Sequence, residues 1–334
     1  MPDIFFEDIE PGTVSTYGSH RVDRDAMVAF AREFDAQPFH LDEAAAAASP
    51  VGRLIASGWY TSALQMRMLC DAWLLRSASL GGPGVEELKW LQPVMAGDIL
   101  SVRQTIVEKQ VSKSRPGMGL VRFTMETLTG DGVVVMRQAH LGMFGLRHGA
   151  PRSQAEPGPL AVGPPAPVFP PEDLERAPRV YDEVEIGRGL DLGPYEFTAE
   201  GVVRFARLFD PQPFHLDEGA AASGPFGALA ASGWHTASAW MRRFAARLDR
   251  MDAAGGRPQI SVSPGSRDLR WMRPVYAGET IRYASEPIEK RPLASRPGWG
   301  VVSSRNSGWN GRGEQVFEFT GSAFWAMRDA NGAP

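Results

Sequence analysis

The chain contains one sequence pattern twice, and this internal repeat constrains the fold more than any other feature. Residues 22–61 and 197–236 are identical at 24 of 40 positions without a gap. Two motifs recur: Phe-Asp-x-Gln-Pro-Phe-His-Leu-Asp at 34–42 and 209–217, and Ala-Ser-Gly-Trp at 56–59 and 231–234. The 334 residues are therefore expected to form two homologous halves, since about 150 residues is a typical domain length.

The repeat continues into the later part of each half with a different spacing. Trp-x-x-Pro-Val-x-Ala-Gly lies at 90–97 and 271–278, and Ser-Arg-Pro-Gly-x-Gly lies at 114–119 and 295–300. The offset between the copies rises from 175 to 181 residues, and we expect the six extra residues near Gly255 to Gly265. Outside these motifs the two halves differ strongly, which indicates an old duplication.

A proline-rich segment separates the halves. Nine of the 27 prolines lie between Pro151 and Pro178. Because proline fixes φ and lacks a backbone N–H, this segment is suited neither to a helix interior nor to a central strand. We expect an N-terminal domain at 1–147, an extended linker at 148–178 and a C-terminal domain at 179–330.

Hydrophobic spacing predicts the same order of elements in both halves. Short helices are expected at 24–34 and 199–209. Asp23 and Thr198 are suited to be their N-caps, and longer apolar helices follow from Gly58 and Gly233. Four β-like runs come next in the first half, at 85–93, 98–110, 119–129 and 133–146. Consecutive strands after one buried helix favour an antiparallel sheet wrapped around that helix, twice in the chain, which is an α+β fold.

Composition excludes several classes of protein. The net charge of −4 gives no general attraction to nucleic acid or to an anionic membrane. A single cysteine, Cys70, rules out an intramolecular disulfide and a cysteine-rich zinc site. The first residues lack the pattern of a signal peptide, and no run of about 18 apolar residues suggests a transmembrane helix. We expect a cytoplasmic protein without a metal site.

The sharpest candidates for chemistry are Asp35 with His40, repeated as Asp210 with His215. A carboxylate and an imidazole side by side can hold a water molecule, with one accepting a proton from it and the other delivering one. The alternative is a helix-ending turn in which the aspartate caps backbone groups and the proline stops the helix. Retention of both residues in two diverged halves favours the functional interpretation.

Two further groups of residues are candidates for binding. Gly58 and Gly233 begin the long helices, where backbone N–H groups favour a developing negative charge. An equally good interpretation is that the serine before each glycine is the N-cap of the helix and that packing requires the glycine. Basic residues at strand ends could form a phosphate site, although exposed cations are common there. The candidates are Lys113, Arg115 and Arg296, with Lys109, Lys290 and Arg291 beside them.

Taken together, the four motifs resemble those of the MaoC-like dehydratases, also called R-specific enoyl-CoA hydratases. The resemblance covers nearly the whole chain, once per half. It implies a double hot-dog fold, in which each antiparallel sheet wraps around one long helix and the two sheets pair. In this family the Asp and His of the motif are the catalytic pair, which implies catalytic roles for Asp35, His40, Asp210 and His215. A backbone N–H near the start of the long helix binds the thioester carbonyl, which implies Gly58 and Gly233. Many relatives have glycine where this chain has Phe34 and Phe209, which predicts a different pocket entrance.

The resemblance also implies a reaction, the reversible addition of water to a trans-2-enoyl-CoA to give a (3R)-hydroxyacyl-CoA. The CoA thioester is the substrate, and no cofactor is expected. Two alternatives are a non-catalytic acyl-CoA-binding module and an acyl-CoA thioesterase. A thioesterase needs an acid or base on the long helix, where the only charged residue in 58–69 is Arg67. Two working sites are predicted, and one working site with a structural twin is the alternative. Neither nucleic acid nor membrane is an expected partner, and a homodimer is compatible with the sequence.

Overall fold

The computed structural model describes residues 2–49, 51–148, 166–169 and 172–328. The first half contains strands β1 (Val14–Arg21), β2 (Gly84–Trp90), β3 (Ile99–Val111), β4 (Met118–Leu128) and β5 (Val134–Gly145). Its helices are α1 (Arg24–Phe34), α2 (Pro38–Leu41), α3 (Glu43–Ala47) and α4 (Gly58–Ala72). The second half contains β6 (Leu190–Glu196), β7 (Gly265–Trp271), β8 (Thr280–Pro292), β9 (Trp299–Trp309) and β10 (Gln315–Ala326). Its helices are α5 (Ala199–Phe209), α6 (Glu218–Ala222) and α7 (Gly233–Ala253). Short 3-10 turns lie at Phe6–Asp8, Leu74–Arg76, Tyr181–Glu183 and Pro213–His215.

All ten strands belong to one sheet, in the order β1-β3-β4-β5-β2-β7-β10-β9-β8-β6. The halves meet where β2 pairs with β7 in antiparallel register. Two glycines allow the backbones to approach closely there: a Cβ on Gly84 would lie 2.2 Å from the carbonyl oxygen of Leu269, and one on Gly265 would lie 2.1 Å from that of Leu88. The continuous sheet confirms the predicted pairing of two sheets, each wrapped around its own long helix.

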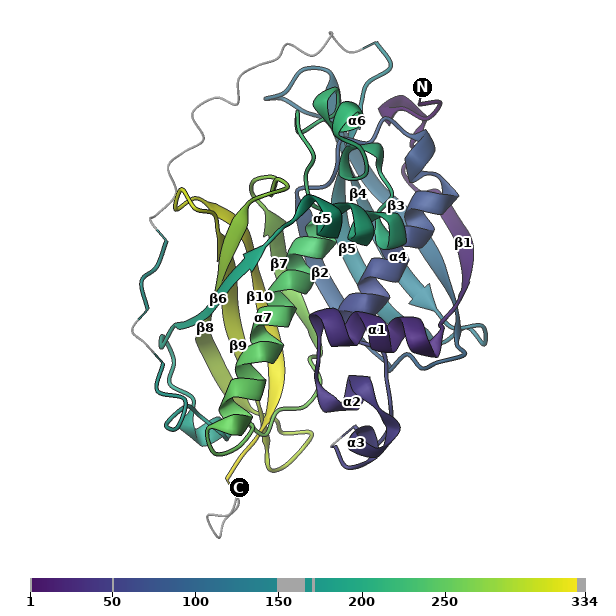
Figure 1. Ribbon diagram of the computed structural model, residues 1–334. Helices are drawn as coiled ribbons and strands as arrows, with labels where there is room; N and C mark the ends of the chain where they lie inside the picture. The colour runs from purple at the N-terminus through teal and green to yellow at the C-terminus, as the bar shows by residue number, and fades with distance from the viewer. Residues whose placement is uncertain (1, 50, 149–165, 170–171, 329–334) are drawn as a thin grey trace.

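Helices α4 and α7 lie against the inner face of this sheet (Figure 1). Their N-caps are Ser57 and Ser232, whose hydroxyls accept from the N–H groups of Trp59 and Trp234. Helix α4 is buried along most of its length, as its apolar sequence predicts. The caps of the shorter helices are also as predicted, since Asp23 accepts from Ala26 in α1 and its counterpart Thr198 caps α5.

Helices α1 and α5 bring the two halves together above the sheet. Helix α1 packs against α7, and α5 packs against α4. Phe34 of α1 meets Phe205 edge-on with ring centroids 5.7 Å apart, and Phe30 meets Phe209 at 5.6 Å. Phe34 is 4% exposed. These phenylalanines therefore stabilise the contact between the halves.

The structure corrects two expectations about secondary structure. Strands β1 and β6, at the two edges of the sheet, were not predicted. The six extra residues do not lie in the loop near Gly255 to Gly265. They lengthen α7, which has 21 residues where α4 has 15. Most of the expected linker at 148–178 lies outside the described residues. No helix in the described ranges is long and apolar enough to cross a membrane.

Candidate active site

The first candidate pair, Asp35 and His40, lies where α1 ends and α2 begins. Asp35 is the C-cap of α1, and Gln37 precedes the proline that starts α2. Because the residue before proline is disfavoured in the helical conformation, the chain must turn there. The turn brings His40 Nε2 to 3.4 Å from Asp35 Oδ2. Both residues are buried, at 3% and 5% exposure.

Hydrogen bonds fix the orientation of both members of this pair. The Ser57 hydroxyl donates to Asp35 Oδ2 at 2.7 Å, and the Gln37 amide donates to Oδ1 at 2.9 Å. His40 Nδ1 lies 2.8 Å from the carbonyl oxygen of Ile55. A carbonyl only accepts, so Nδ1 carries the proton and Nε2 of the neutral ring is left as an acceptor. Two acceptors that face each other across 3.4 Å can hold a water molecule that donates to both.

The second pair has the same internal geometry. His215 Nε2 lies 3.5 Å from Asp210 Oδ2, and His215 Nδ1 lies 2.6 Å from the carbonyl oxygen of Ala230. The Ser232 hydroxyl and the Gln212 amide donate to the Asp210 carboxylate at 2.7 and 2.9 Å. The repeat therefore preserves a complete hydrogen-bonded unit in both halves.

Gly58 lies beside the first pair, at the first position of α4. Its backbone N–H has no acceptor within the helix, because the first N–H groups of a helix point out of its end. A Cβ at this position would lie 2.5 Å from the Trp90 ring, and one on Gly233 would lie 2.4 Å from the Trp271 ring. Packing alone thus requires glycine at both positions, while the helix end remains suited to binding a carbonyl oxygen.

Replacing Gly58 with alanine is expected to destabilise the protein by about 1–3 kcal/mol, because the new methyl group overlaps the Trp90 ring. Thermal unfolding measures the effect. Gly311 provides the control, because it lies at the turn between β9 and β10, where an added methyl group would meet no atom within 4 Å. Equal melting temperatures for the Gly58 and Gly311 variants would contradict the packing requirement.

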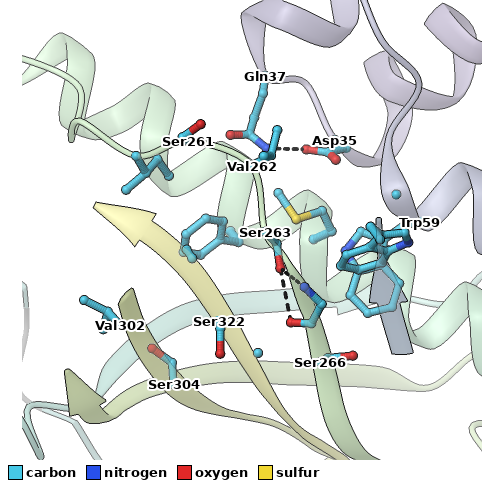
Figure 2. A pocket seen from close by; sticks show the side chains of 18 of the residues that line it. Asp35, Gln37, Trp59, Ser261, Val262, Ser263, Ser266, Val302, Ser304 and Ser322 are labelled. Carbon is cyan, nitrogen blue, oxygen red and sulfur yellow. Dashed lines mark hydrogen bonds between the residues drawn. The ribbon is translucent and has the colours of Figure 1, made fainter. Parts of the chain in front are cut away.

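The first pair opens into a cavity of about 420 Å³ that extends into the second half of the chain. We call this space the inter-half cavity. Asp35, Gln37, His40 and Gly58 line it from the first half. Its second-half lining comes from α7, from the segments before β6 and β7 and from strands β6 to β10. Figure 2 shows Asp35 and Gln37 on one side and Val302 and Ser304 on the opposite side. Neither Phe34 nor Phe209 belongs to the lining.

The second pair has contacts that the first pair lacks. Phe226 stacks on His215 with ring centroids 6.2 Å apart, whereas the matching residue of the first half is the smaller Val51. The Ser79 hydroxyl donates to Gln212 Oε1 at 2.8 Å, whereas the matching residue of the second half is Ile260, which has no hydroxyl. The inter-half cavity does not reach Asp210 or His215.

Cys70 also contacts the second pair. Its thiol lies 3.5 Å from Asp210 Oδ1 and is the donor of that contact. Burial raises the pKa of the Cys70 thiol well above its ordinary value, and the Asp210 carboxylate raises it further. Cys70 therefore stays protonated, which agrees with the sequence interpretation of a small core residue.

The structure separates the candidate cations. Arg296 lines the inter-half cavity and lies over the Trp299 ring at 3.9 Å. Lys113 and Arg115 are exposed between β3 and β4 and do not line it. Lys109 donates to the Glu7 carbonyl at 3.0 Å and Lys290 to the Val184 carbonyl at 2.8 Å, so both hold down the segment at the start of their half. Within the described residues, no cluster of three or more His, Cys, Asp or Glu side chains is arranged to hold a metal ion.

Sequence reasoning missed three features of the site. It treated Ser57 only as an N-cap, although its hydroxyl also binds Asp35. It gave Gln37 no role, although the Gln37 amide binds the same carboxylate. It also missed the second-half lining of the cavity. Comparison of the copies at the offset of 181 could have found this lining, because Phe123 and Met125 correspond to the smaller or more polar Ser304 and Asn306.

Comparisons with known proteins agree with this architecture. The chain matches the model of the MaoC like domain twice, over residues 9–127 and 182–301. A putative MaoC domain protein dehydratase from Chloroflexus aurantiacus superposes with a TM-score of 0.75 at 17% identity, covering 98% of this chain and 99% of that one. A conserved hypothetical protein from Mycobacterium tuberculosis, described as having a double hotdog fold, gives a TM-score of 0.71 at 18% identity, with 96% and 97% covered.

A curated relative whose name states an activity matches part of the chain. It is a 3-hydroxybutyryl-CoA dehydratase from Methylorubrum extorquens, 30% identical over 141 residues, which is 41% of this chain and 82% of that protein. The fold is thus a double hot-dog with a buried Asp–His pair in each half. The chain belongs to the MaoC-like domain family, a family of hydratases and dehydratases.

Proposed function

We propose that the protein catalyses the reversible hydration of a trans-2-enoyl-CoA to a (3R)-3-hydroxyacyl-CoA at Asp35 and His40. The observation that carries this proposal is the buried, hydrogen-bonded pair that opens into a cavity of about 420 Å³. Membership of the MaoC-like family supports the reaction class, and the relative described as a 3-hydroxybutyryl-CoA dehydratase supports a CoA thioester as substrate.

In the proposed reaction a water molecule lies beside Asp35 Oδ2 and His40 Nε2, within hydrogen-bond distance of both. One of the two groups accepts a proton as the water oxygen bonds to C3 of the substrate. That proton is then delivered from the pair to C2, so that the elements of water add across the double bond and the two groups together neither gain nor lose a proton. The bonds from Ser57 and Gln37 keep the carboxylate in position, and the Ile55 carbonyl fixes the histidine ring.

The thioester carbonyl gains negative charge as oxygen bonds to C3. We propose that the Gly58 N–H at the start of α4 donates to this oxygen, because Gly58 lines the same cavity as the pair. The counterpart Gly233 has the same position in α7 but does not line the cavity. The direction in which the CoA lies decides whether its phosphates meet Arg296, or Lys113 and Arg115.

The alternatives named from the sequence have less support. A thioesterase needs an acid or base on the long helix beside the cavity, but the acid of α4, Asp71, pairs with Arg67 at 2.7 Å and does not line the inter-half cavity. A non-catalytic binding module has no use for an oriented carboxylate and imidazole beside the cavity.

Mixing the protein with crotonyl-CoA is expected to lower the absorbance of the conjugated enoyl thioester, because hydration removes the double bond. A thiol reagent added in parallel measures release of free CoA, which a thioesterase would produce. No absorbance change with crotonyl-CoA and with several longer enoyl-CoAs would contradict the proposed function.

A further inference from the structure

The floor of the inter-half cavity is polar where the matching surface of the first half carries bulky side chains. Four inward-facing positions can be compared at the offset of 181 residues. The first-half residues are Val85, Phe123, Met125 and His140, and the second-half residues are Ser266, Ser304, Asn306 and Gly321. All four second-half residues line the cavity. The exchange both widens the space and adds hydrogen-bonding groups.

These residues lie side by side on one face of the sheet. Gly321 of β10 pairs with Ser304 of β9 and with Ser266 of β7. Ser285 of β8 pairs with Asn306 two residues further along β9. Directly paired residues, and every second residue of a strand, share one face of a sheet. One strip on this face, which we call the polar strip, therefore contains Ser266, Ser285, Ser304 and Asn306. Figure 2 shows Ser266 and Ser304 on the strands that form the floor.

Two hydroxyls of the polar strip have no partner among the described residues. Ser285 donates to Asn306 Oδ1 at 2.7 Å, and Asn306 donates to the Ser304 carbonyl at 3.0 Å. Ser266 is 9% exposed, and its hydroxyl bonds to nothing in the described part of the chain. The Ser304 hydroxyl likewise forms no hydrogen bond with a described residue. Because a buried hydroxyl without a partner is costly, the Ser266 hydroxyl points to a ligand that carries hydrogen-bonding atoms, and the half-buried Ser304 is open to the same ligand.

The charges around the cavity indicate that those atoms are neutral. Arg247 lines the cavity with its side chain 3% exposed, but its Nε lies 2.9 and 3.0 Å from the two carboxylate oxygens of Glu172. This ion pair leaves Arg247 no net positive charge for a ligand carboxylate, and Arg296, the other cation of the lining, lies before the start of β9 and not in the part that carries Ser304. Serine hydroxyls and an asparagine amide suit a hydroxyl or carbonyl group instead.

The far end of the cavity indicates which part of the substrate lies on the polar strip. Tyr181, Val184 and Val302 form a buried apolar cluster, and Trp325 packs against it. Val184, Val302 and Trp325 line the cavity. The phosphates of a CoA nucleotide cannot lie among these apolar groups without a large desolvation cost. The acyl group therefore points toward this end, and the CoA lies on the other side of Asp35 and His40.

We propose that the substrate's acyl chain carries a neutral oxygen function, a hydroxyl or a carbonyl, that binds Ser266 and Ser304. This inference rests on the proposed hydratase function and names the class of acyl group that the site prefers. A plain hydrocarbon chain leaves both hydroxyls unpaired, whereas an oxygenated chain satisfies them. A site built to hydrogen-bond a substrate hydroxyl discriminates strongly against the analogue that lacks it.

The test compares trans-2-octenoyl-CoA with analogues that carry a hydroxyl at each successive carbon beyond the double bond. For at least one position kcat/KM is expected to exceed that of the plain chain by about tenfold, the effect of one to two hydrogen bonds. Ser266→Ala and Ser304→Ala should lower this preference toward one, because alanine offers the oxygenated chain no hydrogen bond. Ser303→Ala is the matched control, because Ser303 neighbours Ser304 on β9 but does not line the cavity. Arg296→Ala should leave KM for crotonyl-CoA unchanged, because the CoA lies elsewhere.

Three results would overturn the inference. One is hydration of the plain chain with no preference for any hydroxylated analogue, which would leave the proposed hydratase function intact. Another is an equal loss of kcat/KM for the plain and the hydroxylated substrates in the serine variants. That result would place the CoA part of the substrate on the polar strip. The third is a raised KM for every CoA thioester in Arg296→Ala. Absence of hydration with all substrates would instead contradict the proposed function itself.

Discussion

Replacing Asp35 with asparagine is expected to lower kcat/KM for crotonyl-CoA by about 10²- to 10⁴-fold, whereas Asp210→Asn should leave it within about threefold. Loss of the Asp35 carboxylate removes one member of the pair that would move protons at the substrate. Asp210 has equivalent partners, but the inter-half cavity does not reach it. Steady-state hydration kinetics of the two variants measure the difference.

The two substitutions are closely matched controls for each other. Each removes a carboxylate that accepts from a serine and a glutamine at 2.7 and 2.9 Å. Thermal unfolding of both variants separates lost chemistry from lost folding. Partial loss of activity in each variant would support two working sites, as the repeat in the sequence predicts. Full loss in Asp210→Asn with normal activity in Asp35→Asn would contradict our choice of site.

Acid is expected to destabilise the fold through two buried histidines that lie outside the proposed chemistry. Burial lowers the pKa of His140 to about 4 and that of His235 to about 3, with Arg204 and His215 adding to the effect at His235. In the unfolded chain a histidine titrates near pH 6.5. Above that pH both are neutral in both states, and as the pH falls toward 4 only the unfolded chain takes up the protons. Each histidine therefore lowers the free energy of unfolding by about 1.4 kcal/mol per pH unit below about 6.5.

Urea unfolding at pH 7 and pH 5 measures this loss, which is expected to be about 4 kcal/mol for the two histidines together. His140→Phe keeps a ring against Phe123, on which the imidazole stacks at 5.0 Å. His235→Tyr introduces the residue that the first half has at the matching position, Tyr60. Each variant should lose about half of the acid sensitivity. His148→Gln is the control, because His148 is exposed. An unchanged pH dependence in both buried-site variants would contradict the assignment.

Local sequence signals were sufficient to predict most of the fold. The first short helix was predicted at 24–34 and lies at Arg24–Phe34, because its cap and apolar spacing are both local. Strand β1 was missed because nearly all of its residues are polar or exposed and Gly18 interrupts it at a bulge, so no alternation marks it. The extension of α7 was missed because Gly255 and Gly256 suggested an inserted loop, whereas the helix formers before them lengthen the helix.

The candidate site was predictable in its chemistry but not in its surroundings. The repeat itself pointed to Asp35 and His40 and to their second-half counterparts. The difference between the two pairs depends on Phe226 and Ser79, which reach the second pair through tertiary packing and carry no local signal. The cavity depends on residues more than 200 positions from Asp35, such as Ser266 and Ser304.

The single sheet that joins β2 to β7 has a consequence for how the two halves could change over time. In a dimer of identical subunits, a mutation that widens one acyl pocket widens both, and one that closes one site closes both. A chain that contains both halves is free of this symmetry. Under the proposed function the first half supplies the reactive pair, and the second half lines the cavity with Ser304 and Asn306 where the first half has Phe123 and Met125. Under the proposed function, covalent joining lets reactivity and substrate selection change independently within one chain.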